Sequence, residues 1–156
     1  MSIAIGDPVP DLELTATGDQ RIRLTDYRGR NLVLYFYPRA STPGCTQEGL
    51  DFTAAHADFG AADTLILGVS RDGLRAQQNF KTKQSFPFEL IADTDEQLCR
   101  AFDVIKLKTL YGRESLGIER STFLIDATGT LVREWRKVKV KGHVDEVLEA
   151  ARGLAQ

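Results

Sequence analysis

The sequence contains little of the two residue types that most often bind transition metals, with two cysteines and two histidines in 156 residues. So few cysteines exclude a scaffold held together by several disulfides. The four residues show no paired ligand spacing, and no glycine-rich loop for phosphate occurs, so we expect neither a metal nor a cofactor. The four are Cys45, Cys99, His56 and His143.

The sequence also lacks an excess of charge of one sign, because it contains 20 Lys and Arg and 22 Asp and Glu. The resulting net charge of −2 does not favour a nucleic-acid partner. The longest apolar run, residues 32–37, is far shorter than the roughly 20 residues that cross a bilayer. The N-terminus lacks the pattern of a secretion signal. These absences predict a cytoplasmic protein with no membrane partner, in which the cysteines are not paired in a permanent disulfide.

The chain does contain an ordinary globular composition, with 42% hydrophobic residues, and its length predicts one domain over residues 1–156. Strand patterns alternate with helical patterns, which predicts an α/β fold with a central mixed β-sheet flanked by helices and an N-terminal β-hairpin. Strands are expected at 12–15, 21–25, 31–37, 64–70, 88–93, 121–126 and 130–138. Helices are expected at 44–59, 73–84, 94–102 and 143–153, and residues 104–118 are expected to be irregular.

The segment with the strongest chemical signal is residues 37–48, where a buried strand is followed by a helix. Pro43 and Gly44 predict a turn, which places Cys45 in the first turn of the helix. Unpaired backbone N–H groups and the helix dipole favour an anion at that place, and cysteines at helix starts are often reactive thiolates. Thr42 and Thr46 supply hydroxyl groups on either side of the sulfur. We therefore interpret Cys45 as a reactive thiol rather than a packing residue.

The neighbours of Cys45 narrow the chemistry. Dithiol exchange needs a second cysteine three residues away, and Thr42 and Glu48 occupy those positions. A cysteine hydrolase needs a histidine base, but His56 lies about three helical turns further along, and His143 is expected at the surface. The remaining interpretation is a single activated cysteine, and its natural electrophile is a peroxide.

The motif Pro38-x-x-x-Thr42-x-x-Cys45 resembles the active-site motif of the peroxiredoxin family at every defined position. The run Thr-Pro-Gly-Cys-Thr that starts at Thr42, followed by Glu48, is similar to the bacterioferritin comigratory protein, or peroxiredoxin Q, branch. Residues 6–12 and 117–126 also resemble the corresponding segments of this branch.

The resemblance implies a thioredoxin-like fold and a thiol peroxidase for hydrogen peroxide and organic hydroperoxides. Cys45 would be the peroxidatic nucleophile and would become a sulfenic acid. Thr42 would hold the peroxide oxygens, Pro38 would shield the pocket, and Arg120 would stabilise the thiolate and the transition state. Glu48 would orient an arginine of the site.

Resolving cysteines of this branch usually lie five residues after the nucleophile or on the following helix, where this chain has Leu50 and Lys81. The other cysteine, Cys99, has the spacing of the apolar face of a helix, so we interpret it as structural. This pattern predicts a one-cysteine mechanism in which thioredoxin, glutaredoxin or a small thiol reduces Cys45.

Two alternatives remain open. Without a resolving cysteine, a long-lived sulfenic acid at Cys45 would also suit a redox-responsive interaction protein or holdase. A basic stretch around Trp135 is interpreted as a solvated edge strand rather than a patch for nucleic acid or a protein partner. The branch resemblance favours a monomer. The basic stretch comprises Arg133, Arg136, Lys137, Lys139 and Lys141.

Overall fold

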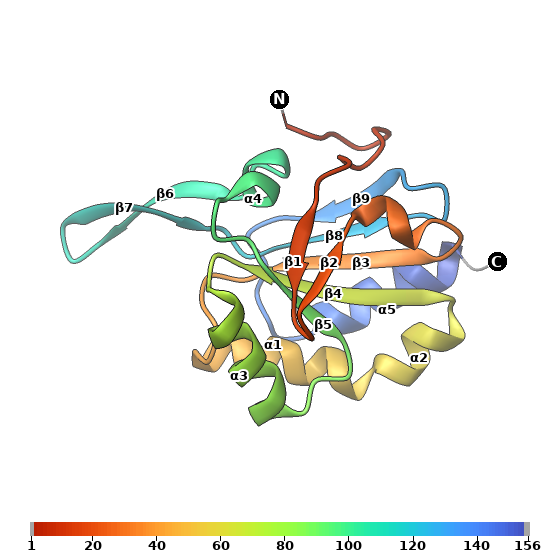
Figure 1. Ribbon diagram of the computed structural model, residues 1–156, viewed down its shortest axis with the longest axis horizontal. Coiled ribbons are helices and arrows are strands. Elements are labelled where there is room, and N and C mark those ends of the chain that lie inside the picture. The colour runs from red at the N-terminus through yellow and green to blue at the C-terminus, as the bar shows by residue number, and fades with distance from the viewer. Residues whose placement is uncertain (1, 155–156) are drawn as a thin grey trace.

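The computed structural model describes residues 2–154, and its centre is a seven-stranded mixed sheet. The strand order is β2-β1-β5-β4-β3-β8-β9 (Figure 1). The sheet strands are β1 (Leu14–Ala16), β2 (Gln20–Ile22), β3 (Asn31–Phe36), β4 (Thr64–Ser70), β5 (Glu89–Ala92), β8 (Ser121–Ile125) and β9 (Leu131–Trp135). The helices are η1 (Leu24–Tyr27), α1 (Pro43–Ala54), α2 (His56–Ala61), α3 (Leu74–Gln84), α4 (Gln97–Ala101) and α5 (His143–Leu154).

Strand β3 lies inside the sheet, and all six of its residues are buried. It runs parallel to β4 and antiparallel to β8. A strand covered on both faces needs apolar side chains in both directions, which explains its uninterrupted apolar sequence. The loop that follows β3 therefore begins at the carboxyl end of a central, buried strand.

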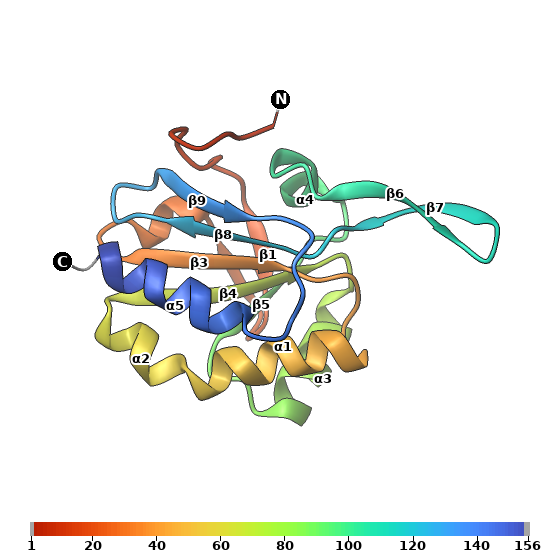
Figure 2. The same cartoon turned by 180° about the vertical axis from the view of Figure 1, so that it is seen from behind.

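The side chains of β3 divide the core into two halves. Val33 and Tyr35 belong to the cluster under α1, α2, α3 and α5, whereas Leu34 and Phe36 belong to the cluster on the opposite face. Figure 2 shows α1, α2, α3 and α5 on one side of the sheet, with α4 and the N-terminal segment on the other. The expected layering of helices on a mixed sheet is confirmed.

The expected N-terminal hairpin is present as β1 and β2, with Leu14 paired to Ile22. The expectation of irregular structure over 104–118 is wrong. Two antiparallel strands, β6 (Ile105–Leu110) and β7 (Arg113–Ile118), form an arm that projects from the body (Figures 1 and 2). Tyr111 and Gly112 connect them with positive φ angles of 54° and 76°, as a two-residue hairpin turn requires.

Two further expectations need correction. The single helix expected over 44–59 is divided at Ala55 into α1 and α2. His143 is buried rather than at the surface, because the start of α5 packs its ring against Phe52 and Trp135, and its Nε2 is hydrogen-bonded to Thr122 Oγ1 at 2.8 Å.

The expected edge strand is β9, the last strand of the sheet, but it ends at Trp135. Of the basic stretch only Arg133 lies on it, and the other basic residues follow in the connection to α5. The guanidinium of Arg133 lies over the Trp135 ring at 4.8 Å, and Arg136 donates hydrogen bonds to two backbone carbonyl groups. Within residues 2–154, no helix is both long enough and apolar enough to cross a membrane.

Candidate active site

Cys45 lies in the first turn of α1, directly after the loop that follows β3. Pro43 occupies the first helical position and has no N–H, and the first helical bond runs from Thr46 N to Thr42 O at 2.8 Å. The N–H groups of Gly44 and Cys45 precede that bond and have no partner within the helix. The Thr42 side chain does not cap them. The Cys45 side chain, which is 1% exposed, therefore lies at the positive end of the helix dipole.

Arg120 reaches Cys45 because of the sheet. Strand β8 runs antiparallel to β3 and places Ser121 opposite Phe36, so Arg120 lies at the edge where β3 ends. Its Nη2 is 3.4 Å from Cys45 Sγ. The structure thus joins two residues that are 75 positions apart in the sequence.

Glu48 lies one helical turn after Cys45 and is fully buried. Its Oε1 accepts a hydrogen bond from Nη1 of Arg120 at 2.6 Å. Burial raises the pKa of Glu48 to about 7, and the attraction of Arg120 offsets only part of that effect. Its second oxygen, Oε2, has no hydrogen-bond partner among the described residues. Burial opposes the charge of Arg120, but Glu48 and Cys45 outweigh it and raise the pKa of that guanidinium.

Gly44 has a role that the sequence signal did not reveal. A Cβ atom at this position would lie 3.2 Å from Nη2 of Arg120. The missing side chain lets the guanidinium approach the helix start and the neighbouring sulfur. The turn signal of Pro43 and Gly44 pointed to a helix boundary but not to this close approach.

Thr42 and Pro38 both border the loop that leads to Cys45, and both are half-buried. The hydroxyl of Thr42 donates a hydrogen bond to Arg39 O at 2.8 Å, which leaves its lone pairs as acceptors. Asp72, after β4, accepts a hydrogen bond from Ala40 N at 2.7 Å and so fixes the middle of the loop.

Cys99 is kept apart from Cys45 by the sheet. Cys45 belongs to the core cluster under α1, and Cys99 belongs to the cluster on the other face. Burial, followed by the charge of Asp93, raises the pKa of the Cys99 thiol far above its ordinary value. Leu50 is exposed on α1, and Lys81 on α3 pairs with Glu89.

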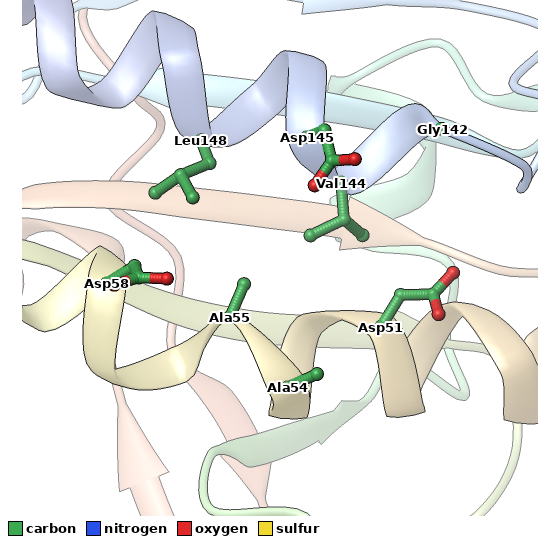
Figure 3. Close-up of a pocket in the computed structure, with 8 residues that line it drawn as sticks. All are labelled: Asp51, Ala54, Ala55, Asp58, Gly142, Val144, Asp145 and Leu148. Atoms are coloured by element: carbon green, nitrogen blue, oxygen red, sulfur yellow. The ribbon is translucent and has the colours of Figure 1, made fainter.

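Two surface hollows flank the outer side of α1. One, of about 330 Å³, lies between α1, α2 and α5, where Ala55 faces Val144 and Leu148 (Figure 3). The other, of about 570 Å³, borders Gly44 and Lys141. Neither is lined by Cys45 or Arg120, and the Cys45 side chain is itself buried. No group of three or more Cys, His, Asp or Glu side chains within the described residues could hold a metal.

Comparison with known proteins gives consistent matches over nearly the whole chain. The profile of the AhpC/TSA family matches residues 5–134. Peroxiredoxin Bcp of Bacillus subtilis is 49% identical over 156 residues, which are 100% of this chain and 99% of the relative. Peroxiredoxin Bcp of Xanthomonas campestris is 54% identical over 146 residues, covering 94% of this chain and 91% of the relative.

A solved structure of the Xanthomonas campestris bacterioferritin comigratory protein, from work on its alkyl peroxide reduction activity, is 53% identical and has a TM-score of 0.90. The match covers 94% of this chain and 93% of that one. The thioredoxin-like fold expected from the sequence is confirmed by this likeness.

Proposed function

Because this chain belongs to the AhpC/TSA family and, within it, to the peroxiredoxins of the Bcp type, we propose that it reduces hydrogen peroxide and organic hydroperoxides through Cys45. The observation that carries the proposal is the 3.4 Å contact between Nη2 of Arg120 and Cys45 Sγ at the start of α1. The alkyl peroxide reduction activity of the Xanthomonas campestris relative supports the inclusion of organic substrates.

The proposed reaction starts from the thiolate of Cys45. Its sulfur attacks the terminal oxygen of the hydroperoxide, the S–O bond forms, and the O–O bond breaks. The sulfur is oxidised by two electrons to a sulfenic acid, and the leaving alkoxide or hydroxide takes a proton to become an alcohol or water. A thiol then attacks the sulfenic sulfur, releases water and forms a mixed disulfide. A second thiol attacks that disulfide and restores Cys45.

The surrounding groups have distinct parts in this scheme. Arg120 and the free N–H groups of the α1 start stabilise negative charge on the sulfur and on the oxygens of the breaking bond. Glu48 fixes the orientation of Arg120 through the 2.6 Å hydrogen bond. The Thr42 hydroxyl accepts a hydrogen bond from the peroxide, and Pro38 limits the entry of water.

We further propose that an external thiol resolves the sulfenic acid. Leu50 and Lys81 leave the usual resolving positions without sulfur. The sheet between the two core clusters keeps Cys99 from Cys45, and the buried Cys99 thiol stays protonated. The reductants that fit this role are thioredoxin, glutaredoxin or a small thiol. We propose that the protein acts as a monomer and in the cytoplasm.

A peroxidase assay tests the function, run in parallel with thioredoxin, glutaredoxin plus glutathione, and dithiothreitol. We expect turnover with at least one reductant, complete loss in Cys45→Ser, and retention in the matched control Cys99→Ser. Oxidation of one equivalent without turnover by any reductant would instead support the redox-responsive interaction protein.

Mass mapping under non-reducing conditions tests the one-cysteine mechanism. After one equivalent of hydrogen peroxide, Cys45 should react with dimedone and no intramolecular disulfide should form. A Cys45–Cys99 disulfide in the folded protein would contradict external resolution.

A further inference from the structure

Lys108 is a cation next to the candidate site that the proposed chemistry does not use. It lies on β6, opposite Ser115 of β7. These two strands form the projecting arm (Figure 2). The aliphatic stem of Lys108 crosses Gly117, where a Cβ atom would lie 3.2 Å from Lys108 Cδ. Its Nζ donates a hydrogen bond to Ile118 O at 2.5 Å. Ile118 is the last residue of β7, and Arg120 follows two positions later in the connection to β8, so the ammonium is held where the arm joins the sheet.

The charge of Lys108 lies within electrostatic range of the reacting sulfur. Burial of its stem, followed by repulsion from Arg120 and Arg71, lowers the pKa of Lys108. Cys45 and Glu119 act in the opposite direction. The hydrogen bond to Ile118 O fixes the ammonium beside the segment that leads to Arg120, so its charge acts on the same region of the molecule.

The pairing of these three cations differs. Arg120 is paired with Glu48 at 2.6 Å, and Arg71 is paired with Glu96 at 2.9 Å. Lys108 makes no ion pair in the part of the chain that the structure describes, and its partner is a neutral carbonyl. An exposed ammonium without a carboxylate partner attracts an external anion.

We propose that Lys108 makes the site select hydroperoxides that carry a carboxylate, by attracting that carboxylate while the O–O group reaches Cys45. This inference depends on the proposed peroxidase function and adds a substrate class to it. Neutral substrates such as hydrogen peroxide make no use of the interaction. The rival explanation is that Lys108 only ties the arm to Ile118, in which case its loss would affect charged and neutral reagents equally.

Alkylation of Cys45 separates these explanations without requiring turnover. Iodoacetate and iodoacetamide have nearly the same size, but only iodoacetate is an anion. We expect Lys108→Met to lower the ratio of their rate constants, iodoacetate over iodoacetamide, by about two- to fivefold. Lys108→Arg should restore the ratio, and added salt should reduce the difference between wild type and Lys108→Met.

Lys106→Met is the matched control, because Lys106 lies on the same face of β6 but is paired with Asp103 at 3.0 Å. It should leave the alkylation ratio unchanged. An unchanged ratio in Lys108→Met, or an equal change in Lys106→Met, would overturn the proposal.

The substrate class is tested with a carboxylate-bearing analogue of tert-butyl hydroperoxide and its methyl ester, with dithiothreitol as reductant. The kcat/KM ratio of acid to ester should fall about two- to fivefold in Lys108→Met and recover in Lys108→Arg. An unchanged ratio would refute the selection of carboxylates. If neither hydroperoxide were turned over, the proposed function would fail, and the alkylation ratio would still decide the electrostatic role of Lys108.

Discussion

The guanidinium of Arg120 contacts both Cys45 and Glu48. Nη2 of Arg120 contacts the sulfur at 3.4 Å, while Nη1 donates to Glu48 Oε1 at 2.6 Å. The rigid fork of arginine allows both contacts at once, whereas a lysine has a single nitrogen. Gly44 makes room for the fork because it has no side chain.

The substitution Arg120→Lys tests the importance of that fork. It keeps the charge but cannot hold both contacts, so we expect the second-order rate constant of Cys45 oxidation to fall about 100-fold. Stopped-flow measurement of peroxide consumption gives the rate constant, and circular dichroism checks the fold. Arg133→Lys on the edge strand β9 is the control and should react like wild type. A rate constant for Arg120→Lys within twofold of wild type would show that charge alone is sufficient.

At the scale of elements, the inner face of α1 packs closely against an aromatic cluster. A Cβ atom on Gly49 would lie 2.3 Å from Phe86 Cζ. The Phe86 ring is held in turn by Phe80, with ring centroids 4.9 Å apart, and by Phe88, at 5.2 Å. Phe86 therefore has little freedom to move away, and the helix that carries Cys45 is held at a short distance from this cluster.

We expect Gly49→Ala to lower the free energy of unfolding by about 1–3 kcal/mol, because overpacking forces the ring or the helix to shift. The matched control is Gly60→Ala on α2, where a Cβ atom would meet nothing within 4 Å. It should raise the free energy of unfolding by about 0.5–1 kcal/mol, since alanine favours a helix over glycine. Urea denaturation measures both values. Equal stability of the two variants would contradict the close packing of Gly49 on Phe86.

At the scale of the whole molecule, two buried groups give the stability opposite dependences on pH. Burial raises the pKa of Glu48 to about 7 from 4.5. Burial and the charge of Arg120 lower the pKa of His143 to about 4 from 6.5. Glu48 stabilises the fold below pH 4.5 and loses that contribution as the pH rises through 7. His143 stabilises above pH 6.5 and loses that contribution as the pH falls through 4.

The substitution Glu48→Gln should remove the decreasing contribution. Between pH 4.5 and 7, the free energy of unfolding of the variant, relative to wild type, should increase with pH. Urea denaturation at a series of pH values measures this difference. A difference that stays constant across the interval would show that Glu48 does not bind its proton more tightly in the folded protein.

The substitution His143→Gln should have the opposite effect. Between pH 4 and 6.5, its free energy of unfolding relative to wild type should decrease as the pH rises, because wild type gains stability there. The same titration provides the measurement. A His143→Gln difference that rises with pH would contradict the neutral state of His143.

Local patterns were sufficient for most of the elements. The apolar run of β3 predicted a strand covered on both faces, and Pro43 with Gly44 predicted the start of the helix that holds Cys45. Alternation of Ile105 and Leu107 with lysines would also have revealed β6, but Gly112 and Gly117 favoured an irregular stretch. The motif around Cys45 was sufficient to predict a nucleophile there, because its spacing within the loop and one helical turn is a local property.

Only the tertiary structure decided which distant groups surround Cys45. Arg120 reaches the sulfur because β8 lies antiparallel beside β3, and no local pattern encodes that register. His143 looked like a surface residue because it follows a basic stretch that contains glycine, yet packing of α5 buries it. Lys108 lies near the site because its Nζ bonds to Ile118 O, and Ile118 ends the arm two residues before Arg120. The sequence by itself placed Cys45 at the start of a helix, and the sheet determined which charges surround it, because Arg120 comes from a separate part of the chain.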